Sequence, residues 1–390
     1  MNKKFLILLI TLTMICALLL AVGCDNNNDG ETSSGNNSLS SGSQDNELNS
    51  GNQDSNGFLF KLNSDNASYT VKGLDTDNNS TQIVIPSTYQ GKPVTNIDNY
   101  AFRNCSNMIS ISISPNILSI GSFAFDGCTA LKGVYITDMS SWCKINFKGS
   151  LSNPLEYARK LYLNGELVSN LVIPADITSI DYYAFYNCED LTSITVEPNN
   201  SVYKSQDNCL IEKQNDRLVL GCKNSIIPDY VKSIGSSAFE GCKGLTSIEI
   251  PTGVDFIGFY AFANCADLTS IVIPSGVEIL CDGVFKNCSS LESIEIPSSV
   301  MEIGMSAFSG CRNLKNIELP HGITDIGQGA FNSCVNLTKI IIPTGVVKIG
   351  TLAFVNCPNL TIYCELSAPL SGWEKTWNGN CPIVWEYIVD

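Results

Sequence analysis

A repeat of 23 residues constrains this chain more than any other feature. Phenylalanine recurs at that spacing from position 239 to position 354, and a cysteine follows each phenylalanine by three positions. The same pairing occurs earlier, with longer gaps between copies, at Phe102, Phe125 and Phe185. A strict period of this length predicts a solenoid, because each unit can bury its apolar face only by stacking on its neighbours.

Each repeat joins a strand pattern to a turn pattern. In residues 291–296 the buried-type Ile294 and Ile296 flank Glu295, which predicts a strand with one buried face, and Pro297 ends it. A second short extended segment should follow, and then a tight helical or 3₁₀ turn at A-F-x-x-C that directs the phenylalanine inward. The glycine of each I-G pair is expected to let the backbone change direction; these glycines are Gly235, Gly258, Gly304, Gly327 and Gly350.

These patterns predict the fold class. A period of about 20 to 29 residues with L-x-x-I-x-I in every copy is typical of leucine-rich repeats, so we expect a β-rich α/β solenoid with a parallel sheet on one face. A parallel β-helix is the alternative, disfavoured because the A-F-x-x-C turn occupies about a third of each coil. Residues 98–360 should carry the repeats, with irregular coils at about 137–227, and residues 58–97 and 361–390 should cap the two ends.

The irregular stretch contains two local signals. Asn153 followed by Pro154 predicts the start of a short helix that runs to Arg159. Residues 161–168 then alternate around Asn164-Gly165, which predicts a hairpin with a two-residue turn.

The cysteines have no pattern of a metal site. Of the 17 cysteines, Cys16 and Cys24 lie in the N-terminal leader, which leaves 15, an odd number. The nine repeat cysteines are expected to be buried thiols that act as small apolar residues. Two further pairs could form disulfides: Cys209 with Cys222, and Cys364 with Cys381. No C-x-x-C pair or histidine partner accompanies them, so neither a metal nor a cofactor is expected.

The N-terminus predicts export. Two lysines precede an apolar run over residues 5–22, so residues 1–23 are expected to be a signal peptide. Residues 20–24 resemble the bacterial lipobox, with Ala21 where leucine is usual, and the resemblance implies a lipid on Cys24. The polar residues 24–57 should form a tether that holds the solenoid outside the membrane. An ordinary secretory signal or a membrane helix is the alternative.

Charge and composition disfavour other function classes. A net charge of −15 argues against nucleic acid as a partner. His321 is the only histidine, and no G-x-S-x-G, H-E-x-x-H or phosphate-binding glycine motif is present. His321 takes the place of Thr or Ser in sister repeats, so a turn role is expected for it. We therefore predict a protein that is not an enzyme; a hydrolase is a remote alternative.

The outward positions of the predicted strands form a candidate binding face. One column should contain Ser247, Ser270, Ser293, Asn316 and Lys339, and the next Glu249, Val272, Glu295, Glu318 and Ile341. Adjacent strands lie about 4.8 Å apart, and two carboxylates at that distance repel by only about 1 kcal/mol in water. A solvated face without a ligand is therefore the alternative.

From residue 58 onward the chain resembles the BspA-type leucine-rich-repeat family. The resemblance lies in the repeated I-P-x-x-V-x-x-I-G-x-x-A-F-x-x-C, in SWCKINF and LYLNGELV, and in the closing GWEKTWNGNCPIVW. It implies an exported or surface protein that attaches to a host or neighbouring cell. From this resemblance together with the lipobox, we expect a monomeric, lipid-anchored protein of the cell envelope that binds a protein or glycan of such a cell. A structural or immune-shielding protein without a high-affinity ligand is the second reading.

Overall fold

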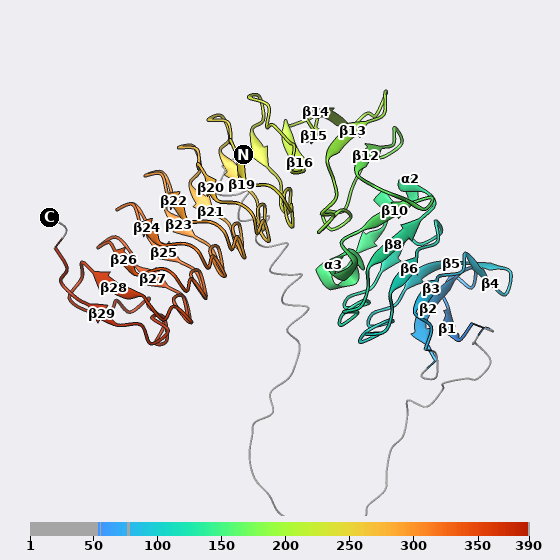
Figure 1. Ribbon diagram of the computed structural model, residues 1–390, viewed down its shortest axis with the longest axis horizontal. Coiled ribbons are helices and arrows are strands. Elements are labelled where there is room, and N and C mark those ends of the chain that lie inside the picture. The colour runs from blue at the N-terminus through green and yellow to red at the C-terminus, as the bar shows by residue number, and fades with distance from the viewer. Residues whose placement is uncertain (1–53, 55, 76–78, 389–390) are drawn as a thin grey trace, which may run out of the picture. The chain divides into compact units, whose positions relative to one another are not determined.

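The computed structural model describes residues 54, 56–75 and 79–388, which form a stack of coils with parallel strand pairing from one coil to the next (Figure 1). The predicted signal peptide, Cys24 and nearly all of the predicted tether lie outside the described residues. The leucine-rich-repeat solenoid predicted from the 23-residue period is confirmed.

One side of the solenoid is built by the L-x-x-I-x-I strands and is named here the first sheet face. Its sheets run in the orders β11-β10-β8-β6-β3, β12-β13, β18-β20 and β22-β24-β26-β28-β29. The strands are β3 (Gln82–Val84), β6 (Ser110–Ser112), β8 (Gly133–Ile136), β10 (Leu161–Leu163), β11 (Glu166–Leu167), β12 (Asn170–Ile173), β13 (Ser193–Val196), β18 (Ser247–Ile248), β20 (Ser270–Ile271), β22 (Ser293–Glu295), β24 (Asn316–Glu318), β26 (Lys339–Ile342), β28 (Thr361–Cys364) and β29 (Ile383–Val384).

A second side is built by the short strands before each I-G pair and is named the second sheet face. It comprises β1 (Phe58–Leu62), β2 (Tyr69–Leu74), β4 (Thr88–Tyr89), β5 (Lys92–Ile97), β7 (Ser119–Ile120), β9 (Asn146–Phe147), β14 (Tyr203–Gln206), β15 (Cys209–Glu212), β16 (Arg217–Leu220), β17 (Ser233–Ile234), β19 (Phe256–Ile257), β21 (Ile279–Leu280), β23 (Glu302–Ile303), β25 (Asp325–Ile326) and β27 (Lys348–Ile349). The β1–β2 hairpin covers the N-terminal end of this face.

The A-F-x-x-C segments form tight turns. The turn N–H groups bond three residues back, as from Ala307 to Gly304 and from Cys311 to Phe308, but left-handed residues interrupt the run at Ser306 (φ 54°) and Gly310 (φ 77°). These residues rotate alternate N–H groups toward the next coil, so that Phe308 donates to the carbonyl of Ala330 at 2.8 Å. A third hydrogen-bonded ladder therefore joins the coils.

The three ladders enclose the apolar core. The phenylalanine rings from Phe239 to Phe354 are buried and stack on one another, with centroids 5.1 to 5.8 Å apart. Buried residues form two clusters, one from Phe58 to Cys222 and the other from Cys209 to Cys381, whose ranges overlap within the irregular stretch. At the C-terminal end Trp377 lies edge-on against Phe354, and this contact closes the stack.

The I-G glycines have a different role from the one predicted. The φ angle of Gly327 is not positive, so its backbone conformation does not require glycine. A Cβ atom on Gly327 would instead lie 2.5 Å from the carbonyl carbon of Gly304 and from the amide nitrogen of Met305 in the preceding coil. The prediction was therefore wrong in its cause: glycine is required because the backbones of successive coils touch here.

Both local signals in the irregular stretch are confirmed as elements. The stretch contains α2 (Met139–Cys143), η1 (Ser150–Ser152) and α3 (Leu155–Ala158), and the Asn153 side chain accepts a hydrogen bond from the Leu155 N–H at 2.9 Å. The hairpin pairs Tyr162 with Leu167 around a turn at residues 164–165, whose φ angles are both positive.

Candidate functional site

The structure brings the predicted binding residues together on the first sheet face. Ser293 is paired in register with Asn316, and Asn316 with Lys339; Glu295 is paired with Glu318 and is bridged to Val272. Ser247 pairs with Ser270 in the same way. The two columns expected from the repeat thus stand next to each other on the outside of the solenoid.

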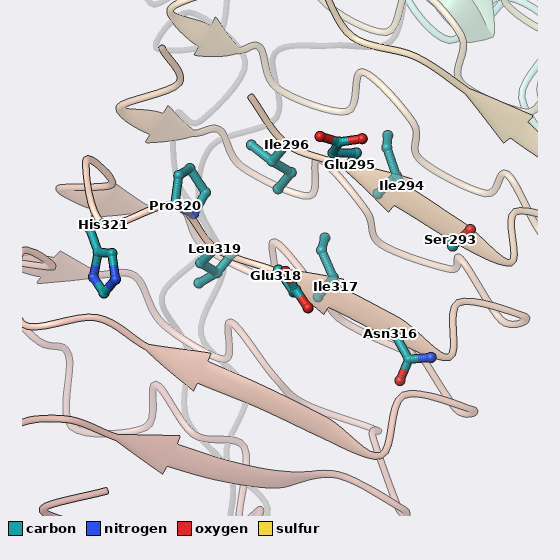
Figure 2. A pocket seen from close by; sticks show the side chains of 10 residues that line it. All are labelled: Ser293, Ile294, Glu295, Ile296, Asn316, Ile317, Glu318, Leu319, Pro320 and His321. Carbon is teal, nitrogen blue, oxygen red and sulfur yellow. The ribbon is translucent and has the colours of Figure 1, made fainter. Parts of the chain in front are cut away.

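A shallow groove of about 620 Å³ lies over β22 and β24 on this face. Figure 2 shows its lining: outward Ser293, Glu295, Asn316 and Glu318 on β22 and β24, and the loop residues Pro320 and His321 after β24. His321, expected to be only a turn residue, therefore lies at the edge of the predicted face. The groove combines two carboxylates with hydroxyl, amide and imidazole groups.

Of the two apolar positions on the face, one is exposed as predicted and the other is not. Val272 is 69% exposed, as expected for an outward apolar residue. Ile341, expected to be exposed, is only partly so, because its strand is paired with β28 and the register places Tyr363 beside it. The apolar surface that Ile341 offers to a partner is thus smaller than predicted.

Lys339 belongs to an aromatic cluster at the C-terminal end of the face. Its ammonium group lies 5.0 Å from the ring centre of Tyr363 and 4.7 Å from that of Tyr387, and it donates to the Tyr387 hydroxyl at 2.9 Å. Cation–π contacts of this kind contribute about 0.5 to 1 kcal/mol each at exposed sites. Lys339 therefore places a positive charge, in contact with two tyrosine rings, beside the acidic groove.

A pair of tyrosines lies on the N-terminal part of the same face and was missed in the sequence. Tyr135 and Tyr162 are paired across β8 and β10, and their rings stack with centroids 4.6 Å apart. The signal was present, because each occupies the outward x of a strand pattern, V-x-I for Tyr135 and L-x-L for Tyr162. It was overlooked because these coils fall outside the strict 23-residue register.

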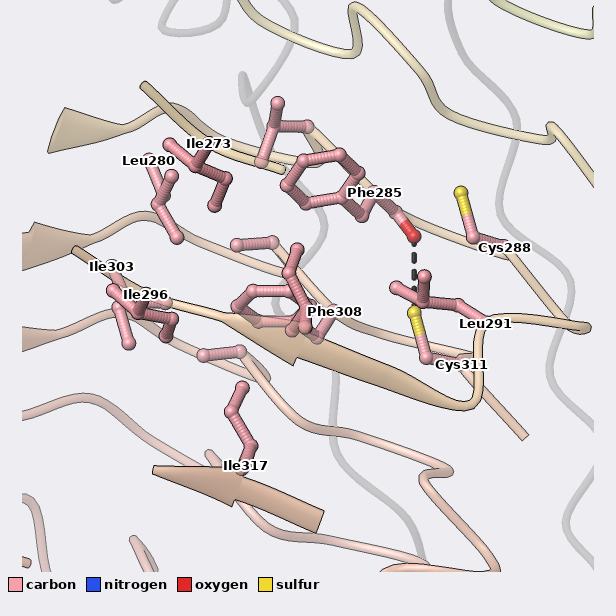
Figure 3. Close-up of a cluster of buried hydrophobic side chains, with 14 of the residues drawn as sticks. Ile273, Leu280, Phe285, Cys288, Leu291, Ile296, Ile303, Phe308, Cys311 and Ile317 are labelled. Atoms are coloured by element: carbon pink, nitrogen blue, oxygen red, sulfur yellow. Dashed lines mark hydrogen bonds between the residues drawn. The ribbon is translucent and has the colours of Figure 1, made fainter. Parts of the chain in front are cut away.

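Seven of the nine repeat cysteines are buried as predicted, whereas Cys105 and Cys188 are only partly buried. Six of the seven form a ladder of hydrogen-bonded thiols. The Cys311 Sγ donates to the Phe285 carbonyl of the preceding coil at 3.1 Å, as Figure 3 shows, and Cys288 donates to Phe262 at the same distance. Burial raises the pKa of the Cys311 thiol to about 12. These side chains are thus protonated donors within the core, in addition to being the small apolar groups expected.

The two proposed disulfides are corrected by the structure. All four cysteines are free thiols. β15, which begins at Cys209, pairs with β16 in a register that sets Leu210 opposite Leu220, with a bulge beside Leu210. Cys222 lies two residues beyond the end of β16, so the two cysteines are not opposite each other. Cys381 instead donates to the Phe354 carbonyl at 3.3 Å and continues the thiol ladder.

Two partly buried carboxyl groups, one on α3 and one in the first regular A-F-x-x-C turn, lie near enough to influence each other's charge. Burial, with the nearby Glu156, raises the pKa of Glu240 to about 7, and burial also raises the pKa of Glu156. Glu240 accepts a hydrogen bond from Asn264 at 3.4 Å, whereas Glu156 Oε2 is buried without a hydrogen-bond partner in the described part of the chain. Glu156 and Glu240 are 84 positions apart, so no sequence pattern pointed to this pair.

Residues 54, 56–75 and 79–388 contain no group of three or more His, Cys, Asp or Glu side chains placed to hold a metal ion. Within the same described residues, no helix has the length and apolar character needed to cross a bilayer.

Comparisons with known proteins agree on the repeat. The profile of the BspA type leucine rich repeat region matches in six copies, over residues 156–215, 219–304 and 279–371, which is more than half of the chain. No curated protein matches.

Several solved structures of bacterial proteins are similar. The pneumococcal vaccine antigen PcpA is 16% identical, with 86% of this chain and 98% of that chain covered and a TM-score of 0.50, which is a likeness of fold. A leucine-rich-repeat protein from Bacteroides ovatus is 24% identical (84% and 69% covered, TM-score 0.40), and a leucine rich cell surface protein from Faecalibacterium prausnitzii is 25% identical (83% and 96% covered, TM-score 0.40).

Proposed function

Since the chain belongs to the BspA-type leucine-rich-repeat family, we propose that it is a binding scaffold without catalytic activity, which engages a protein or glycan on a neighbouring cell through its first sheet face. The observation that carries this proposal is the groove centred on Glu295 and Glu318. Its polar side chains project from paired strands, whose positions are fixed by the ladders on either side.

Rigid placement suits such a surface to recognition. The side chains of the groove stand on two paired strands, so their spacing does not have to be organised when a partner arrives, and the entropic cost of binding falls. The acidic pair favours a partner with a basic patch, and the mixed hydroxyl and amide groups around it provide hydrogen bonds for orientation.

Display at the cell surface is a second part of the proposal. The predicted leader and Cys24 would leave the protein held by lipid, with the solenoid beyond a polar tether. The proposal is tested by growing cells with a clickable fatty acid and following the label on the protein. We expect labelling of the natural chain and none of Cys24→Ala; label retained by the variant would refute lipidation at that residue.

The binding face is tested with purified protein on intact host or neighbouring bacterial cells. The variant Glu249→Gln/Glu295→Gln/Glu318→Gln is expected to bind at least about tenfold more weakly, the equivalent of about 1.4 kcal/mol. The matched control makes the same charge change on the second sheet face: Glu278→Gln/Glu302→Gln/Asp325→Asn. Equal binding by the natural protein and both triple variants would exclude the first sheet face as the binding surface. If none of the three proteins binds, the shielding role is favoured.

A further inference from the structure

The stacked tyrosines Tyr135 and Tyr162 are held in a defined position on the first sheet face. A Cβ atom on Gly133 would lie 3.0 Å from one ring and 3.1 Å from the other, so both rings lean over this glycine. Any larger residue at 133 would push them away from the sheet. In Figure 1 the strands that carry them, β8 and β10, lie side by side with β6.

The Tyr135 ring keeps one face open. Its other face is covered by Tyr162, and on the open side the adjacent strand β6 presents only the small Ser110 and Ser112. Beyond them, on β3, stands Val84, which is 63% exposed. The hydroxyl groups of Ser112, Tyr135 and Tyr162 make no hydrogen bond within the residues that the structure describes.

Two lysines stand at the adjoining ends of the strands that carry the rings. Lys160 immediately precedes β10 and Lys132 immediately precedes β8, and the Val134 N–H donates to the Lys160 carbonyl at 2.9 Å. Both lysines are exposed, and neither forms an ion pair in the described part of the chain. In a chain with a net charge of −15, this is a local site for an anion.

The backbone here is closed to an extended peptide. Strands β6, β8 and β10 each have a partner on both sides, so their N–H and C=O groups are used within the sheet. A peptide could not add a strand and would have to bind through side chains alone. A sugar requires no backbone partner: the C–H face of a pyranose stacks on an aromatic ring, and its hydroxyl groups take the free hydroxyls around it.

From this geometry we propose that Tyr135 and Tyr162 form a site for a pyranose ring of an acidic glycan, with Tyr135 as the stacking surface and Lys160 and Lys132 facing the sugar carboxylate. This inference rests on the proposed function, since it assigns a partner class to the same face. The site is distinct from the groove at Glu295 and Glu318 and is tested separately from it.

The experiment titrates the full chain with a hyaluronan hexasaccharide, which repeats a glucuronate, and with cellohexaose, which is neutral. Calorimetry is expected to show binding of the acidic probe and weaker binding of the neutral one. Tyr135→Ala/Tyr162→Ala should weaken hyaluronan binding by about tenfold or more. Tyr363→Ala removes an outward tyrosine at the far end of the face and serves as the matched control. Circular dichroism of each variant checks that the solenoid is folded.

Several results would overturn the inference. They are failure of both probes to bind, binding that Tyr135→Ala/Tyr162→Ala leaves unchanged, or an equal loss in Tyr363→Ala. Preference for cellohexaose would overturn the role of the lysines. If the double tyrosine variant still binds cells while the Glu→Gln triple variant does not, the proposed function stands without a sugar site. If instead the Glu→Gln triple variant still binds cells and the double tyrosine variant does not, the sugar site stands and the acidic groove is excluded as the binding surface.

Discussion

Gly327 shows how little room separates one coil from the next. An added Cβ would lie 2.5 Å from backbone atoms of the preceding coil, a distance that side-chain movement cannot relieve. We therefore predict that Gly327→Ala lowers the free energy of unfolding by about 2 to 4 kcal/mol through overpacking. Chemical denaturation measures the loss. Gly322→Ala, where the nearest atom would be 3.3 Å away, is the control and should cost far less.

The thiol of Cys311 is predicted to contribute both packing and a hydrogen bond. Cys311→Ala removes the sulfur and leaves the Phe285 carbonyl without its side-chain donor, so we expect a loss of about 1 to 2 kcal/mol in unfolding free energy. Cys311→Ser keeps a donor beside that carbonyl and should lose less. If serine proves more destabilising than alanine, the thiol acts only as an apolar group. Because burial raises the pKa of this thiol to about 12, iodoacetamide should not label it in the folded protein.

At the scale of elements, the strand faces and the places of the turns could be predicted from the sequence, but the backbone conformation within the turns could not. Alternation around Glu295 defines a strand whatever its surroundings, so the outward columns followed directly. The left-handed residue before each A-F pair is Ser306 in one coil and Tyr260 in another, so no residue type marks it. The backbone conformation there is imposed by the hydrogen bonds to the next coil, which are tertiary contacts.

The carboxyl pair between α3 and the turn at Glu240 makes a pH-dependent contribution to stability. Burial and Glu156 raise the pKa of Glu240 from 4.5 to about 7, against the lowering effects of Lys286, Ser237 and Tyr186. A raised folded-state pKa favours the protonated acid, so stability is retained at low pH and is lost as the pH rises from 4.5 through about 7. The loss at higher pH is at most about 3 kcal/mol.

Glu240→Gln is therefore expected to melt at a higher temperature than the natural protein at about pH 8 and to differ little from it at about pH 4.5. Thermal melts across this range provide the measurement. Glu278→Gln, an exposed glutamate on the second sheet face, is the control for the change of net charge. A difference between Glu240→Gln and the natural protein that does not vary with pH would contradict the assignment.

At the scale of the whole molecule, the two apolar clusters predict that a core substitution destabilises the coils around it and not the whole solenoid. Phe308 lies in the middle of the C-terminal cluster, and Phe308→Ala should cost about 3 to 5 kcal/mol. In a solenoid each coil contacts only its neighbours, so the effect should stay near the mutation. Hydrogen–deuterium exchange should rise in residues 285–354 and remain unchanged in residues 110–173. A uniform rise along the chain would show that the clusters unfold together.

The stacked phenylalanines have a consequence for how such a chain can change length. Between Phe239 and Phe354 each ring meets the ring 23 residues away, and each repeat thiol from Cys265 to Cys357 meets the preceding phenylalanine carbonyl. The upper surface of one coil therefore matches the lower surface of any other in this range. Unequal recombination that deletes or duplicates 23 codons would join surfaces that already fit. The span of the first sheet face can thus evolve in whole steps, without redesign of the core.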